Sequence, residues 1–165
     1  MTEELVMSVA SLATLCIPIA LWGLFWGFTD RLVVFNGKED LLLTALGYAS
    51  TIATLVASAH SSTVTFLLMG VTAIIVLISF GESRRANGSF MKACIALPTK
   101  FMLLFLILFL WMAAFGAMNE ALKEHKKGNV RAAAKNAGAG AAGLLGALIV
   151  GKIIRKLVKA RVSSD

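Results

Sequence analysis

Charged residues are scarce in this chain of 165 residues, and long stretches have none. Asp, Glu, Lys and Arg together make up 15% of the sequence. An ionisable side chain at the centre of a bilayer costs at least ~2.5–3.5 kcal/mol. Hydrophobic residues make up 58%, more than the roughly 45–50% of a soluble domain. An ordinary soluble domain is therefore excluded, and membrane-spanning helices are predicted. The stretches without charge are residues 6–29, 41–59, 61–80 and 101–119.

The residue sets that carry out catalysis or hold metals are also missing. The two cysteines, Cys16 and Cys94, and the two histidines, His60 and His125, are isolated from one another, and none has a second ligand at metal spacing. The sequence contains no Ser/His/Asp set, no phosphate-binding glycine loop and no pair of acids inside an apolar stretch. We therefore predict that the protein is not an enzyme and needs no metal and no cofactor.

The apolar stretches predict an all-α integral membrane protein. We expect a polytopic bundle of four or five transmembrane helices with a basic amphipathic C-terminal extension. At ~1.5 Å per residue, the predicted helices measure about 27–36 Å, which matches a hydrocarbon core of ~30 Å. The acidic start Glu3-Glu4 lacks the basic region of a signal peptide, so we expect the first stretch to remain as a span. The four predicted helices cover residues 5–28, 41–59, 63–80 and 101–118.

The connections between these helices differ in length. His60-Ser61-Ser62 predicts a tight turn between the second and third helices. A longer loop, Gly81–Lys100, is predicted before the fourth helix. We expect it to contain a short interfacial helix over 90–97, because Pro98 should end that helix and begin the next one.

The C-terminal part differs in kind from the rest. We divide the chain into a four-helix transmembrane domain, 1–118, and a C-terminal region, 119–165. That region begins with a charged helix ended by Gly128-Asn129 and continues with a Gly/Ala-rich helix and a basic tail. The apolar run 137–151 is short for a span, but extending it to 132–154 reaches ~34 Å if its flanking lysines snorkel to the headgroups.

The distribution of basic residues indicates an orientation. With five spans and the N-terminus outside, most Lys and Arg lie on the inside, as the positive-inside rule favours. With four spans both termini lie inside, and the sequence leaves this alternative open. The five-span arrangement predicts a multi-pass protein of a bacterial inner membrane, with its C-terminus in the cytoplasm.

Small residues recur every four positions in the last helix and form a ridge of the small-xxx-small kind. Such ridges let helix backbones approach closely in membranes. They fit either packing between copies around a symmetry axis or packing within one chain. In composition the helix is similar to the pore and ring helices of mechanosensitive channels and rotary-ATPase rings. The essential acid of the ring family is missing, since 125–164 contains no Asp or Glu. The ridge residues are Gly138, Ala139, Ala142, Gly143, Gly146, Ala147 and Gly151.

Two other patterns are candidates for contact sites. A polar stripe follows one face of the second helix, where it predicts either interhelical hydrogen bonds or a wall facing water or substrate. Basic residues in the third loop and the tail predict contact with anionic headgroups or an acidic protein. We expect no nucleic-acid partner, because these residues lie at helix ends. The stripe is Thr44, Gly47, Thr51, Thr54 and Ser58, and the basic residues are Arg84, Arg85, Lys152, Arg155, Lys156, Lys159 and Arg161.

Three functional hypotheses follow from these patterns. The first is a homo-oligomeric membrane assembly, such as a channel or pore, with the small-residue helix at its centre. The second is an anchor or accessory subunit that recruits a soluble cytoplasmic protein through the third loop and the tail. Small proteins of this size and topology occur in secretion, immunity and phage-defence systems, which is an analogy and not a motif match. The third, a small transporter, is disfavoured because we find no inverted repeat and no buried charge in the sequence.

Overall fold

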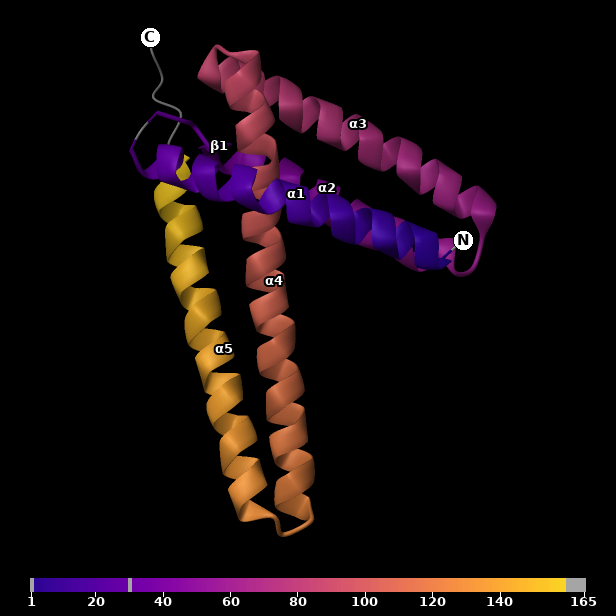
Figure 1. Ribbon diagram of the computed structural model, residues 1–165, viewed down its shortest axis with the longest axis vertical. Coiled ribbons are helices and arrows are strands. Elements are labelled where there is room, and N and C mark those ends of the chain that lie inside the picture. Colours follow the sequence, from indigo (N-terminus) through magenta and orange to yellow (C-terminus); the bar gives the residue numbers. More distant parts are fainter. Residues whose placement is uncertain (1, 30, 160–165) are drawn as a thin grey trace. The chain divides into compact units, whose positions relative to one another are not determined.

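The computed structural model describes residues 2–29 and 31–159, and nearly all of them are helical. The expected all-α architecture is confirmed (Figure 1). Two strands of two residues each, β1 and β2, pair in parallel with Phe35 opposite Val158. The helices within the described residues are α1 (Thr2–Phe28), α2 (Gly37–Ser58), α3 (Ser62–Asn87), α4 (Phe90–Lys126) and α5 (Val130–Leu157), and the strands are β1 (Phe35–Asn36) and β2 (Val158–Lys159).

Four of the helices, α2 to α5, are long and apolar enough to cross a membrane. The chain is therefore a membrane protein with several helices able to span a bilayer, and the Gly/Ala-rich helix is among the four that are long and apolar enough. A crossing by α1 (Thr2–Phe28) stays a prediction. The orientation and the bacterial inner membrane also stay predictions.

The long third loop expected before α4 does not exist. α3 continues through the first charged residues to Asn87, and Gly88 ends it with a left-handed backbone at φ 62°. The last turn is held in place because the Asn87 side chain exchanges two hydrogen bonds with the backbone of Val33, at 2.8 and 2.9 Å. Arg84 and Arg85 therefore lie on a helix and not on a loop.

The sequence predicted that Pro98 separates two helices. In the structure it lies inside the continuous helix α4. The proline removes the N–H that would otherwise bond the Cys94 carbonyl, and one residue further on the hydroxyl of Thr99 donates to the Ile95 carbonyl at 2.7 Å. The prediction of a separate interfacial helix over 90–97 was wrong. This part of α4 is instead held against α1, where Ile95 and Thr99 lie directly over Gly23.

The described chain forms two compact units. The first comprises residues 1–102 and 157–165, and the second comprises residues 103–156. In the second unit α4 and α5 run side by side in opposite directions as a hairpin, with the turn after Lys126 at its tip (Figure 1). Gly128 makes this turn with φ 78°, as the Gly-Asn pair predicted. The division expected at residue 118 stays a prediction.

Candidate functional sites

One face of α5 packs against α4 throughout the hairpin. Its buried residues Ala133, Gly140, Ala147 and Ile154 are spaced by seven, which is the repeat of helices that pack along a left-handed seam. On α4 the buried residues of this seam are Leu103, Ala114 and Ala121. Most of these side chains are small, so the two helix axes can approach closely.

Gly143 shows how close this approach is. A Cβ added there would lie 3.0 Å from the Cβ of Ala114 and 3.2 Å from the carbonyl oxygen of Leu110. Gly146 is almost as crowded, since its Cβ would lie 3.3 Å from two side-chain carbons of Leu110. The hairpin therefore needs small residues at these positions for its own packing, before any contact with another chain.

Within its own unit, residues 103–156, the opposite face of α5 is uncovered. Gly138 has no neighbour within 4 Å of an added Cβ, and Ala142 is exposed. One and two turns further on, Leu145 and Ile149 are 61% and 60% exposed. These four residues follow one another at spacings of 4, 3 and 4, so they form one stripe along the helix. We call Gly138, Ala142, Leu145 and Ile149 the outer face of α5.

The ridge predicted from the sequence is thus divided between two faces. Gly143, Gly146 and Ala147 lie on the side toward α4, and Gly151 is half-buried with Ile107 3.8 Å from its added Cβ. The other three members, Gly138, Ala139 and Ala142, are exposed. Intrachain packing accounts for the first group only, and a role of the second group in an oligomer stays a prediction.

The polar stripe of α2 faces α3 over part of its length. Thr54 lies 3.4 Å from Thr72 of α3 in a hydroxyl–hydroxyl contact, and Thr72 in turn donates to Ser50 at 3.0 Å. Thr51 donates to the carbonyl of Gly47. Two further members differ: Thr44 is fully buried, whereas Ser58 at the far end donates only to its own helix.

A buried ion pair lies at the other end of this stripe. The ammonium of Lys100 donates to both carboxylate oxygens of Asp40 at 2.7 and 2.6 Å. It also donates to the hydroxyl of Ser83 at 2.7 Å, and the backbone N–H of Asn36 donates to the Asp40 carboxylate at 2.8 Å. The side chains of Lys100 and Asp40 are 0% and 2% exposed. This cluster joins the start of α2, the last turns of α3 and the first part of α4.

Hydroxyls continue inward from this cluster. Thr44 is one turn beyond Asp40 on α2, and Ser79 is one turn before Ser83 on the antiparallel helix α3. Both are buried, at 0% and 1% exposure. Thr44 donates to the Asp40 carbonyl at 2.7 Å, whereas the Ser79 hydroxyl has no hydrogen-bond partner among the residues that the structure describes. One turn further, Gly47 meets Ile75 and Phe101, and the interior becomes apolar.

The sequence did not reveal this pair. Asp40 directly precedes the predicted helix 41–59, and Lys100 ends the predicted loop 81–100. The statement that no charge is buried was therefore wrong, and it no longer counts against a transporter. The local sequence carries no signal of this burial, because a lysine directly before the charge-free run 101–119 is also the usual flank of a spanning helix.

The predicted basic contact residues lie in separate places. Arg84 and Arg85 are exposed and line a shallow surface depression with Gly81 and Gly88, and Arg85 pairs with Glu82 at 3.1 Å. Near the end of α5, Lys152, Arg155 and Lys156 are exposed. Lys159 belongs to β2, and Arg161 lies outside the described residues.

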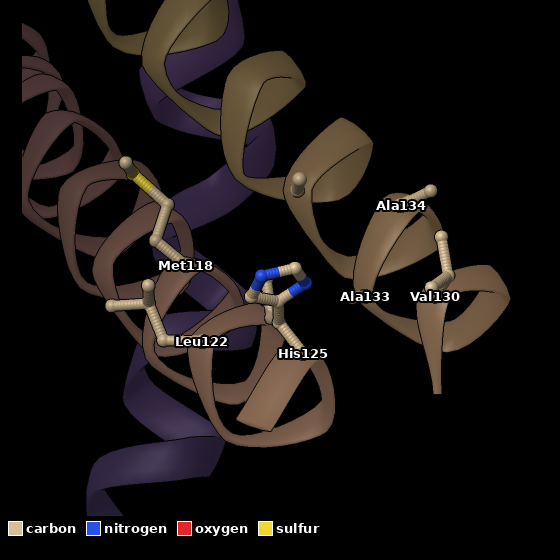
Figure 2. A pocket seen from close by; sticks show the side chains of 8 residues that line it. Met118, Leu122, His125, Val130, Ala133 and Ala134 are labelled. Carbon is tan, nitrogen blue, oxygen red and sulfur yellow. The ribbon is translucent and has the colours of Figure 1, made fainter. Parts of the chain in front are cut away.

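An apolar groove is present at the tip of the hairpin, between the end of α4 and the start of α5. Its volume is about 410 Å³, and it opens to the surface. Figure 2 shows the imidazole of His125 in the space between the two helices, among apolar side chains. The lining residues are Met118, Ala121, Leu122, His125, Val130, Ala133, Ala134 and Ala137.

Two ion pairs neutralise part of the charge around this tip. Lys123 contacts Glu120 at 2.7 Å, and Lys127 contacts Glu124 at 2.8 Å. The hydrogen bond to Glu124 and its negative charge raise the pKa of Lys127, which lies beyond the end of α4. Lys127 therefore stays protonated throughout the physiological range.

No family model matches the chain, and no curated protein or solved structure shows significant similarity to it. Any function proposed for the protein is therefore inferred from the residues of this chain alone.

Proposed function

We propose that the protein is a non-enzymatic membrane protein that assembles with copies of itself through the outer face of α5. The observation that carries this proposal is the open small-xxx-small pair Gly138–Ala142 on a spanning helix. Within a bilayer, apolar surface alone does not drive helices to associate, because the lipid chains around them are equally apolar. A small-residue pair adds close backbone contact, which lipid chains cannot match.

The outer face is suited to a copy of itself. Small residues occupy its beginning and large ones, Leu145 and Ile149, its end, so two parallel copies can bring Gly138 against Gly138. Parallel orientation is the one that copies inserted in the same direction adopt. Residues 136–151 contain no charge, so no ion pair has to be desolvated on contact.

The test is the mass of the detergent-purified protein, measured by light scattering for the wild type and for Gly138→Leu. We expect the wild type to be a defined multiple of 17.5 kDa and the variant to shift toward the monomer. Leucine is a better helix former than glycine by roughly 1 kcal/mol, and Gly138 has open space around it, so the variant should fold.

Gly70→Leu is the matched control, because Gly70 is an exposed glycine of the spanning helix α3 with equally open surroundings. The control should keep the wild-type mass. An unchanged mass in Gly138→Leu would exclude the outer face as the contact. A wild-type monomer would refute the oligomer altogether, and a copurified second polypeptide would favour the anchor hypothesis.

Whether the assembly conducts ions is a separate measurement. If the copies close into a ring, ion flux through liposomes containing the wild type should exceed that of empty liposomes. Gly138→Leu should abolish such flux and Gly70→Leu should not. An assembly that gives no flux would be a structural oligomer and not a channel.

A further inference from the structure

The groove at the hairpin tip combines an apolar lining with uncompensated positive charge. Of its lining residues only His125 carries an ionisable side chain. Around it, the two acids of the tip, Glu120 and Glu124, each already pair with a lysine. Within residues 31–159 the remaining cations of this region, Lys126, Arg131 and Lys135, form no ion pair.

Each of these cations directly follows a lining residue of the groove in the sequence, one on α4 and two on α5. Lys126 follows His125 directly and lies one turn after Leu122 on α4. On α5, Arg131 follows Val130, and both Arg131 and Lys135 are exposed. A ligand with an apolar body in the groove could therefore place a negative group among cations from two helices. The volume of about 410 Å³ lies within the ~300–1,000 Å³ that is usual for ligand sites.

The position of the groove along α4 indicates what kind of molecule reaches it. The charge-free stretch of α4 ends at Asn119, and the groove begins at Met118 and continues to His125. It thus lies where a spanning helix leaves the hydrocarbon and enters the headgroup layer. At this depth a membrane supplies molecules that have an acyl chain on one side and a phosphate on the other.

We propose that this groove binds an anionic phospholipid. Its acyl chain lies against Met118, Leu122 and Val130, and its phosphate is held by Lys126 and Arg131 with His125 at the rim. The site is separate from the outer face of α5 and does not depend on oligomerisation. Anionic lipid is favoured over zwitterionic lipid because each unpaired cation near a membrane surface attracts a net negative headgroup.

The experiment is native mass spectrometry of delipidated protein in detergent, titrated with phosphatidylglycerol or with phosphatidylcholine of the same acyl chains. We expect phosphatidylglycerol to bind at least about tenfold more tightly, since each cation contributes roughly fivefold in affinity. The double variant Lys126→Gln/Arg131→Gln should lose this preference. Ala137→Phe, which fills the groove from an exposed position, should weaken the binding of both lipids.

The matched control is Lys123→Gln/Lys127→Gln, which removes the same charge from the same tip but from lysines already paired with glutamates. It should keep the preference for phosphatidylglycerol. Equal affinity of the wild type for the two lipids would overturn the proposal, and so would an equal loss in the control. Unchanged binding in Ala137→Phe would show that the lipid sits elsewhere. Circular dichroism confirms that each variant retains its helices.

Discussion

At the scale of single residues, the structure depends most on the pair Lys100–Asp40. Both charges are withdrawn from water, the bond to Ser83 uses the third donor of Lys100, and the Asn36 N–H adds a third hydrogen bond to the Asp40 carboxylate. Such a pair is costly to bury, and it becomes far more costly when one partner is lost, because the other charge then remains buried alone. Its contribution is therefore to hold α2, α3 and α4 in one register.

The first prediction concerns this pair. Lys100→Met should lower the free energy of unfolding by about 3–5 kcal/mol, because it leaves the Asp40 carboxylate without its cation. The double variant Lys100→Met/Asp40→Leu should recover most of that loss, since no charge then remains. Unfolding in denaturing detergent, followed by circular dichroism, measures both variants. Equal instability of the single and double variants would show that the charge is not the cause.

The second prediction concerns the orphan hydroxyl of Ser79. A buried polar group without a partner costs about 1–3 kcal/mol, so Ser79→Ala should leave stability unchanged or raise it. Ser83→Ala is the control, because the Ser83 hydroxyl accepts from Lys100 and its removal should lower stability. The same unfolding assay compares the two. A clear loss in Ser79→Ala would mean that its hydroxyl has a partner, such as a bound water.

At the scale of the element, α5 has two faces that carry similar residues in different surroundings. Gly143 is packed against the backbone of α4, whereas Gly138 is open. A leucine at Gly143 should therefore disturb packing within the hairpin, whereas a leucine at Gly138 should disturb contact between copies. The two variants therefore distinguish packing within the hairpin from packing between copies, which the Gly/Ala pattern alone does not distinguish.

The third prediction makes this comparison. Gly143→Leu should destabilise the protein by about 1–3 kcal/mol, the usual cost of overpacking a tight contact. Gly138→Leu should not destabilise the monomer and serves as the control on the same helix. Thermal unfolding in detergent reads both. If both variants unfold like the wild type, the close approach of α4 and α5 at Ala114 is not formed in the membrane.

At the scale of the whole molecule, the number of spans decides which side each contact site faces. The α4–α5 hairpin has its tip at Gly128-Asn129, and both of its helices are long and apolar enough to cross a membrane. The tip and the loop before α2 should therefore lie on opposite sides if α2 and α3 also cross. With α1 crossing as well and the N-terminus outside, as predicted from the basic residues, the anionic-lipid groove would face outward and the basic tail inward.

The fourth prediction tests that arrangement. With Cys16 and Cys94 replaced by Ser, a membrane-impermeant maleimide should label Asn129→Cys in intact cells. Lys38→Cys, in the loop before α2, should be labelled only after the membrane is permeabilised. The opposite pattern would invert the orientation. Labelling of both from one side would mean that one of the intervening helices does not cross.

The sequence alone determined the class of the protein and most of its helices. Charge-free runs of about 20 residues have one stable solution in a bilayer, because backbone groups must pair within each segment and charges must stay outside. The two turns were recognisable from their own polar and turn-forming residues, Gly128-Asn129 and His60-Ser61-Ser62. These features depend on local chemistry and on the solvent, and no distant contact is needed to fix them.

Only the tertiary structure decided the residues whose role depends on a distant partner. Lys100 and Asp40 are separated by 60 positions. The residues next to each of them therefore do not show that it has a partner of opposite charge. Pro98 lies inside a helix whose neighbouring residues Ile95 and Thr99 contact Gly23 of α1, and this contact is not visible in the local sequence. The Gly/Ala ridge divides into a packed face and an open face because α4 covers one side only, and a pattern of small residues is the same on both sides.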